Sequence, residues 1–165
     1  MDKPVSWKAS GLSWLLLSGA VIVADQIVKV VVLATLQPYQ PREVIPGLLS
    51  WTLAFNTGAA FSFLHDESGW QRWLFSLLAI GVSAALVRWL ATIPRRDWRN
   101  ALPLSLVIGG AIGNLIDRLR FGQVTDFIDV YWRDAHFPAF NVADSAISVG
   151  AILLIWFGLF ATKKS

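Results

Sequence analysis

Four long apolar segments constrain this chain more than any other feature of its sequence. They cover about residues 12–36, 70–90, 101–119 and 140–161, and a helix needs roughly 20 apolar residues to cross a bilayer. Of the 165 residues, 55% are hydrophobic and only 15% are charged, which excludes an ordinary soluble domain. We therefore expect a single membrane-embedded domain over 1–165, an all-α integral membrane protein with four transmembrane helices and a small outer β element.

The first apolar segment has an alternative interpretation. Residues 12–24 follow Lys3 and Lys8 and could form the core of a secretory signal peptide. However, hydrophobicity resumes after Asp25, and no small-residue cleavage pattern ends the run. We therefore expect a spanning helix, in which Asp25 and Lys29 share one face and can form an ion pair. That pair could serve only to position the helix, or Asp25 could also contact a substrate backbone or steady a site.

Basic residues collect in three segments that four spans would place on one side of the membrane. These segments hold eight of the 14 basic residues: Lys3, Lys8, Arg88, Arg95, Arg96, Arg99, Lys163 and Lys164. The positive-inside rule assigns that side to the cytoplasm, so both termini should be cytoplasmic. The charge thus follows membrane topology, and nucleic acid is not an expected partner.

Two segments should lie on the opposite, outer side. Residues 37–69 contain helix-breaking prolines, a strand-like run from Leu49 to Phe55, and then a turn of small residues around Asn56 and Gly58. That turn would let backbone or a ligand approach closely, although a plain hairpin is the alternative. Residues 121–138 form a second outer loop that contains three aspartates, including Asp126.

Metal and thiol chemistry are not expected. The chain has no Cys and only two His, which excludes disulfides, a thiolate nucleophile and Cys-bound metal or haem, and disfavours a histidine-rich metal site. We expect no cofactor.

Polar side chains instead gather at the predicted outer ends of the spans. Asn114 with Asp117, and Asn141 with Asp144, are each three residues apart, so each amide shares a helix face with a carboxylate that it could orient. Arg118 is the expected counter-ion of Asp117. Such a cluster could merely pack helices, or could serve ion transport. The polar groups favour one face of the membrane, however, and the second span has no acid to continue a path.

Asp126 and Asp144 are the expected reacting pair. Two nearby carboxyl groups cannot both ionise easily, so they share a proton, and one can activate water while the other protonates a carbonyl oxygen. Asp144 lies in the first turn of the fourth span, where the helix dipole favours a carboxylate. We therefore expect Asp126 to hold the proton.

Five motifs mark the chain: Asp25-Gln26-Ile27-Val28-Lys29, Asn56 to Ser62, Gly109 to Arg118, Val124-Thr125-Asp126-Phe127, and Phe140 to Ser145. With these motifs the chain closely resembles bacterial lipoprotein signal peptidase, the signal peptidase II family, over nearly its whole length. The resemblance implies a membrane aspartic endopeptidase that removes signal peptides from diacylglyceryl-modified prolipoproteins, cleaving before the lipid-modified Cys. It also implies the cell inner membrane, with the active site near the periplasmic face and a mobile outer arm within residues 37–69.

The resemblance further implies a role for each polar position. Asp126 and Asp144 would be catalytic, and five residues would bind substrate: Asn56, Gly58, Asn114, Arg118 and Asn141. Asp25, Lys29 and Asp117 would support the site. The implied partners are diacylglyceryl prolipoproteins, membrane lipid and globomycin-like inhibitors, and one copy of the chain suffices for the mechanism.

Overall fold

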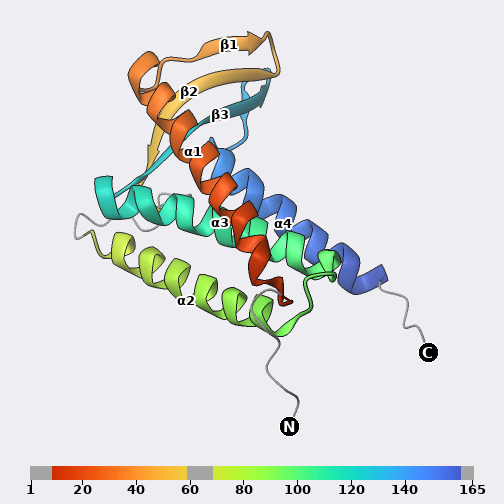
Figure 1. The fold of residues 1–165 in the computed structure, drawn as a ribbon. Coiled ribbons are helices and arrows are strands. Elements are labelled where there is room, and N and C mark those ends of the chain that lie inside the picture. Colours follow the sequence, from red (N-terminus) through yellow and green to blue (C-terminus); the bar gives the residue numbers. More distant parts are fainter. Residues whose placement is uncertain (1–8, 59–68, 161–165) are drawn as a thin grey trace.

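The computed structural model describes residues 9–58 and 69–160, which form four long helices below a small antiparallel sheet (Figure 1). A short 3-10 helix, η1 (Gly11–Trp14), leads into α1 (Leu15–Thr35), and α2 (Trp70–Thr92), α3 (Trp98–Phe121) and α4 (Val142–Phe160) follow. All four are long and apolar enough to cross a membrane, which confirms the predicted fold class. The lysines at positions 3, 8, 163 and 164, used above to orient the chain, lie outside the described residues.

The helices end where local sequence signals interrupt them. After α2, Ile93 is extended (ψ 149°), as expected for the residue before Pro94. At the end of α3, Gly122 takes a left-handed conformation (φ 77°) and its N–H bonds to the Arg118 carbonyl oxygen, a common glycine C-cap. These signals place the ends of α2 and α3 within a few residues of the predicted ends.

Helix α3 is the centre of the bundle and packs against α1, α2 and α4. Its glycines make this packing close. A Cβ atom added at Gly109 would lie 2.9 Å from the Ser18 carbonyl oxygen of α1, and one added at Gly110 would collide with the backbone of Ala143 in α4. Helices α1 and α4 can therefore approach α3 almost backbone to backbone, which brings the polar residues of all three helices together.

The sheet has strand order β1-β2-β3-β4 and joins both outer segments. Strands β1 (Arg42–Ile45) and β2 (Leu49–Asn56) come from the first outer segment, whereas β3 (Val124–Trp132) and β4 (Ala135–His136) come from the second. The prediction that residues 121–138 form only a loop is thus wrong. Strand β3 forms because it pairs antiparallel with β2. It also buries Phe127 against Leu53 of β2 and against Val32, which lies near the end of α1.

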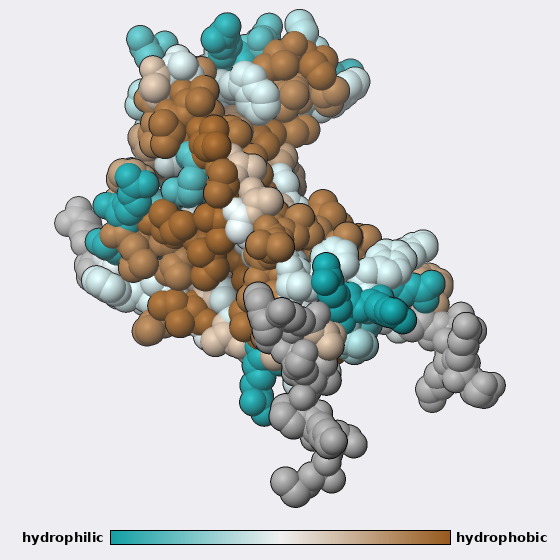
Figure 2. All heavy atoms as spheres, viewed as in Figure 1, coloured by the Kyte–Doolittle hydropathy of each residue, from teal (hydrophilic) through white to brown (hydrophobic). Residues whose placement is uncertain are grey.

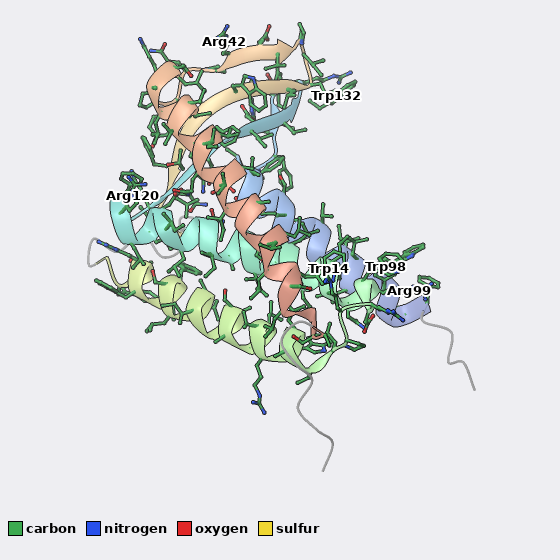
Figure 3. The ribbon with its side chains drawn as sticks, viewed as in Figure 1. Trp14, Arg42, Trp98, Arg99, Arg120 and Trp132 are labelled. Atoms are coloured by element: carbon green, nitrogen blue, oxygen red, sulfur yellow. The ribbon has the colours of Figure 1, made fainter. Side chains whose placement is uncertain are left out.

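The helices carry a large exposed apolar surface, as membrane-spanning helices do. Figure 2 shows hydrophobic residues over the flank of the bundle and hydrophilic ones around the sheet, and Leu16, Leu77 and Leu159 are 83%, 67% and 74% exposed. Figure 3 shows Trp14, Trp98 and Arg99 at the end of the bundle that lies away from the sheet. Amphipathic aromatic and basic side chains are typical of a membrane–water boundary, so this end and the sheet lie at opposite boundaries.

Candidate active site

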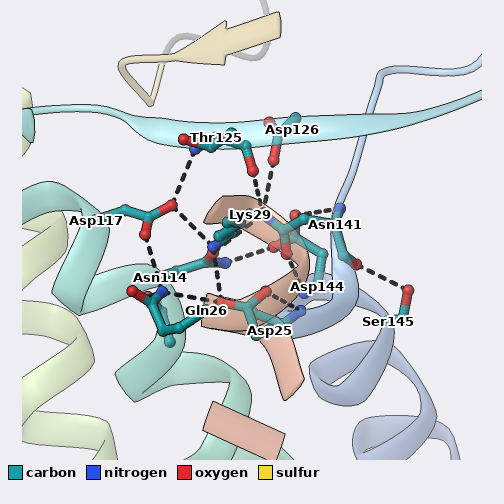
Figure 4. A network of polar contacts seen from close by, with 12 residues as sticks. Asp25, Gln26, Lys29, Asn114, Asp117, Thr125, Asp126, Asn141, Asp144 and Ser145 are labelled. Carbon is teal, nitrogen blue, oxygen red and sulfur yellow. Dashed lines mark hydrogen bonds and ion pairs between the residues drawn. The ribbon is translucent and has the colours of Figure 1, made fainter. Parts of the chain in front are cut away.

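The predicted polar residues of three helices meet one strand at the end of the bundle beside the sheet (Figure 4). Helix α1 brings Asp25 and Lys29, α3 brings Asn114 and Asp117, β3 brings Asp126, and the start of α4 brings Asn141 and Asp144. All are buried except Asp144, which is half-buried. Because burying a polar group without a partner is costly, the contacts among these residues decide what the cluster can do.

Lys29 is the charged centre of the cluster. Its Nζ atom lies 2.9 Å from Asp25 Oδ2 and 2.8 Å from Asp117 Oδ2, and it donates a third hydrogen bond, of 3.0 Å, to Asn114 Oδ1. These three contacts use all three ammonium donors. The predicted pair of Asp25 and Lys29 is therefore present, within a larger network. The prediction that Arg118 is the counter-ion of Asp117 is wrong, because Lys29, which reaches across from α1, forms that ion pair.

The two aspartates bound to Lys29 each hold a backbone N–H group beside a predicted catalytic residue. Asp25 Oδ1 accepts a 2.9 Å hydrogen bond from the N–H of Ala143, which precedes Asp144. Asp117 Oδ2 accepts one of 3.0 Å from the N–H of Thr125, which precedes Asp126. The ion network thus fixes the backbone at both acids, and Asp25 steadies the site through contacts within the protein.

Asn141 links Asp126 to Asp144. Its side-chain oxygen accepts a 2.8 Å hydrogen bond from the Asp144 N–H, as an N-cap residue does at the start of a helix. Its amide nitrogen donates to Asp126 Oδ1 at 2.7 Å, while its backbone N–H donates to Asp144 Oδ2 at 3.3 Å. One residue therefore holds both carboxyl groups.

Each side-chain amide donates to a carboxyl group on another element, and not to the carboxyl group on its own helix. We expected Asn114 to orient Asp117 and the Asn141 side-chain amide to orient Asp144. Instead, Asn114 Nδ2 donates to Asp144 Oδ1 at 2.7 Å and the Asn141 amide orients Asp126. The two amides also bond to each other, at 3.1 Å. Packing of α3 against α4 aligns these faces, so each acid is held by an amide from another element.

The environment of Asp126 favours its protonated form. Burial, aided by the charge of Asp144, raises the pKa of Asp126 to about 7, although hydrogen bonds from Asn56 and Asn141 act in the opposite direction. Its neighbour on β3, Asp129, behaves differently. Burial alone would raise the pKa of Asp129, but hydrogen bonds from its polar neighbours, chiefly His136, outweigh burial and lower it. A carboxyl group that titrates near neutral pH can give or take a proton under physiological conditions.

Asn56, Gly58 and Arg118 lie at the edge of the cluster. Asn56, at the end of β2, accepts a hydrogen bond from the Gly58 N–H at 2.8 Å, which closes a short turn, and it also contacts Asp126. Arg118 interacts electrostatically with Asp144, Asp126 and Asp117. Residues 59–62 of the same motif, and part of the segment expected to contain the outer arm, lie outside the described residues.

Three residues contribute contacts that sequence reasoning did not assign. Gln26 Nε2 donates to Asp25 Oδ2 at 3.2 Å and to Asp117 Oδ1 at 3.0 Å, so it bridges the same two acids that Lys29 binds. Thr125 contributes only its backbone, through its N–H and its carbonyl oxygen. Ser145 Oγ donates to the Asn141 carbonyl oxygen at 2.9 Å. Of these three residues, Gln26 could have been recognised from the sequence, because it is a polar residue within an apolar span.

No group of three or more His, Cys, Asp or Glu side chains within residues 9–58 and 69–160 is arranged to hold a metal ion. The cluster instead offers two carboxyl groups held by neutral amides. That arrangement suits proton transfer to and from water.

Comparison with known proteins identifies close relatives. The family model described as "Signal peptidase (SPase) II" matches residues 17–160. A lipoprotein signal peptidase of Pseudomonas putida is 54% identical over 100% of this chain and 96% of its own length, and one of Pseudomonas aeruginosa is 56% identical over 93% and 91%. A solved structure described as a bacterial membrane enzyme superposes with a TM-score of 0.78 at 33% identity, covering 91% of this chain and 94% of that one.

Proposed function

The chain belongs to the signal peptidase II family, and from this premise we propose that it is an aspartic endopeptidase that cleaves diacylglyceryl-modified prolipoproteins before the lipid-modified Cys. Membership of this family implies that the chain removes signal peptides from prolipoproteins. The two-aspartate mechanism rests on one observation: Asn141 bonds to Asp126 through its amide and to Asp144 through its backbone. Two carboxyl groups held around one residue, with Asp126 titrating at about 7, form a pair that can share a proton.

The proposed reaction begins with Asp126 protonated and Asp144 ionised. Asp144 takes a proton from a water molecule, whose oxygen attacks the scissile carbonyl carbon, while Asp126 gives its proton to the carbonyl oxygen. The nitrogen of the scissile bond takes the proton held by Asp144, and the C–N bond breaks as the gem-diol returns a proton to Asp126 and its C–O double bond re-forms. The products are a signal peptide with a new carboxyl group and a lipoprotein with a free amino group on its modified Cys.

The surrounding residues have separate roles in this proposal. Asn114 and Asn141 keep the two acids in place, Lys29 with its two aspartates supports the backbone, and Asn56, Gly58 and Arg118 contact the substrate. Because the cluster lies beside the sheet, at the end of the bundle opposite the Trp14 boundary, we place it near the periplasmic face of the inner membrane, with both termini cytoplasmic. Water and a membrane-anchored peptide can meet there. A globomycin-like cyclic peptide would compete for this site, and a single copy contains every group that the mechanism uses.

Cleavage of a synthetic lipobox peptide tests the proposal. The peptide carries diacylglycerol on its Cys, and the matched control peptide has a free thiol. The wild-type protein in detergent micelles should cleave only the lipidated peptide, and Asp126→Asn and Asp144→Asn should each lose activity while remaining folded. Near wild-type turnover by either folded variant would refute the dyad. Binding of the lipidated peptide without cleavage by the wild type would instead indicate a non-catalytic binding protein.

A further inference from the structure

The aromatic ring of Phe75 in α2 contacts two parts of the candidate site. The Arg118 guanidinium carbon lies 5.2 Å from the centre of the ring, within the range of a cation–π interaction. The ring also fills the space next to Gly58, where an added Cβ atom would lie 2.6 Å from the Phe75 Cδ2 atom. Gly58 also has a φ of 102°, so glycine is required there both for its backbone and for the ring.

The ring of Phe75 is one of the contacts of the Arg118 guanidinium. A guanidinium group in a protein is normally fixed by several hydrogen bonds, often in a bidentate pair with a carboxylate. Here the Nε atom of Arg118 is buried without a hydrogen-bond partner in the described part of the chain, and the ion pairs of Asp117 and Asp25 are formed by Lys29. A contact with the face of Phe75 can therefore help to hold the Arg118 cation in place.

We propose that Phe75 is a positioning residue, whose ring, seated against Gly58, holds the Arg118 guanidinium beside the two catalytic acids. This inference rests on the function proposed above. Phe75 touches neither acid in its proposed role and acts through Arg118. This role of Phe75 explains why α2, a spanning helix without an acidic residue, contributes to the site. It also explains why the turn after β2 lies so close to α2.

The charges around Arg118 determine which measurement detects a displaced guanidinium. It interacts with Asp117 on its own helix, with Asp126 on β3 and with Asp144 on α4, while Lys29 and Asp25 on α1 form the neighbouring ion network. A cation held near acids favours their ionised forms. If the guanidinium moves away, the pH profile of kcat should shift to higher pH. A mutation that only loosened the packing would lower the folded fraction without such a shift.

The test compares Phe75→Leu, which keeps an apolar side chain but removes the aromatic face, with Phe75→Tyr, which keeps the ring. Phe121→Leu is the matched control, because Phe121 also lies under an arginine, with the Arg120 guanidinium carbon 5.1 Å from its centre, but on the exposed end of α3. In the lipidated-peptide assay, Phe75→Leu should lower kcat/KM about 3- to 10-fold, as expected for loss of a partly buried cation–π contact. Phe75→Tyr and Phe121→Leu should stay within about twofold of wild type.

A double-mutant cycle isolates the coupling to Arg118. In an Arg118→Gln background the ring has no cation to hold, so Phe75→Leu should change kcat/KM by less than about twofold. An equal loss in both backgrounds, or equal losses from Phe75→Leu and Phe75→Tyr, would overturn the inference. If Phe75→Leu lowers the thermal unfolding midpoint in detergent, Phe75→Met provides a second variant with a smaller change in packing. Because Met also lacks the aromatic face, the same decrease in kcat/KM is expected. Activity retained by Asp126→Asn would refute the proposed dyad. Activity retained by Phe75→Leu would instead overturn the positioning role of Phe75.

Discussion

Replacing Asn141 by Ala should extend activity to higher pH. The mutation removes the 2.7 Å hydrogen bond from the Asn141 amide to Asp126, which stabilises the ionised carboxylate and lowers its pKa. Hydrogen bonds to charged groups contribute about 1.5–3 kcal/mol, and about 1.4 kcal/mol corresponds to one pKa unit. Loss of the bond should therefore raise the pKa of Asp126, which is about 7 in the wild type, by roughly 1–2 units. Because Asp126 must be protonated to act as the acid, the basic limb of the pH profile moves upward by the same amount.

The measurement is kcat against pH, from about pH 5 to 10, with the lipidated peptide in detergent micelles. Asn141 also caps α4, so its loss should cost about 0.5–2 kcal/mol of stability as well. Asn141→Ser separates the two effects, because Ser is a good N-cap residue but is too short to replace the amide donor. Asn141→Ser should therefore be more stable to heat than Asn141→Ala. The basic limb of its pH profile should still lie at higher pH than that of the wild type. A basic limb that stays in place, or moves to lower pH, in both variants would refute this account of Asp126.

Lys29, Gly110 and Asp126 provide three further tests. Lys29→Met leaves two buried carboxylates without their cation, so the free energy of unfolding should fall by about 3–5 kcal/mol, measured as a lower unfolding midpoint in detergent. Gly110→Ala places a methyl group against the α4 backbone at Ala143 and should reduce kcat/KM more than about tenfold by displacing the dyad, whereas Gly81→Ala, with open space around it, should leave kcat/KM unchanged. Asp126→Asn should stabilise the fold relative to wild type by up to about 4 kcal/mol above pH 7, because a pKa raised from 3.8 to about 7 makes wild-type stability fall as pH rises through that interval. Unfolding curves should show this difference disappearing below about pH 4.

The sequence was sufficient to predict the four helices but not the whole sheet. A spanning helix is specified by its own composition, and proline and glycine mark its ends, so the predicted and observed helices agree within a few residues. Strand β3 was missed because its three-dimensional partner, β2, precedes it by about 70 residues. Within β3, Asp129 is buried and bonds to Ser50, Thr52 and His136. Strand pairing over such a distance has no local signature.

The same distinction explains which parts of the candidate site could be foreseen. Polar residues inside apolar spans are expensive, so Asp25, Lys29 and Asn114 could be recognised individually. The pairing of Asp25 with Lys29, four residues apart on one helix, could also be predicted, whereas the partners of Asn114 on the other helices could not be. Sequence spacing shows which residues share a helix face, but packing at Gly110 decides which face of α4 meets α3. Likewise, close packing of α1 on α3 at Gly109 brings Lys29 to Asp117, which the neighbouring position of Arg118 in the sequence does not reveal.

The contacts of the four clustered aspartates explain why chemistry falls to two of them. Asp25 and Asp117 each bond to the Lys29 cation and to a backbone N–H group, so their oxygens are committed to holding the fold. In the described part of the chain, the hydrogen bonds to Asp126 and Asp144 come from neutral amide donors, and the nearby Arg118 interacts with both acids electrostatically. A carboxyl group that is not committed to a direct ion pair remains available to exchange a proton. The same residue type therefore serves as scaffold or as candidate catalyst, according to whether it forms a direct ion pair.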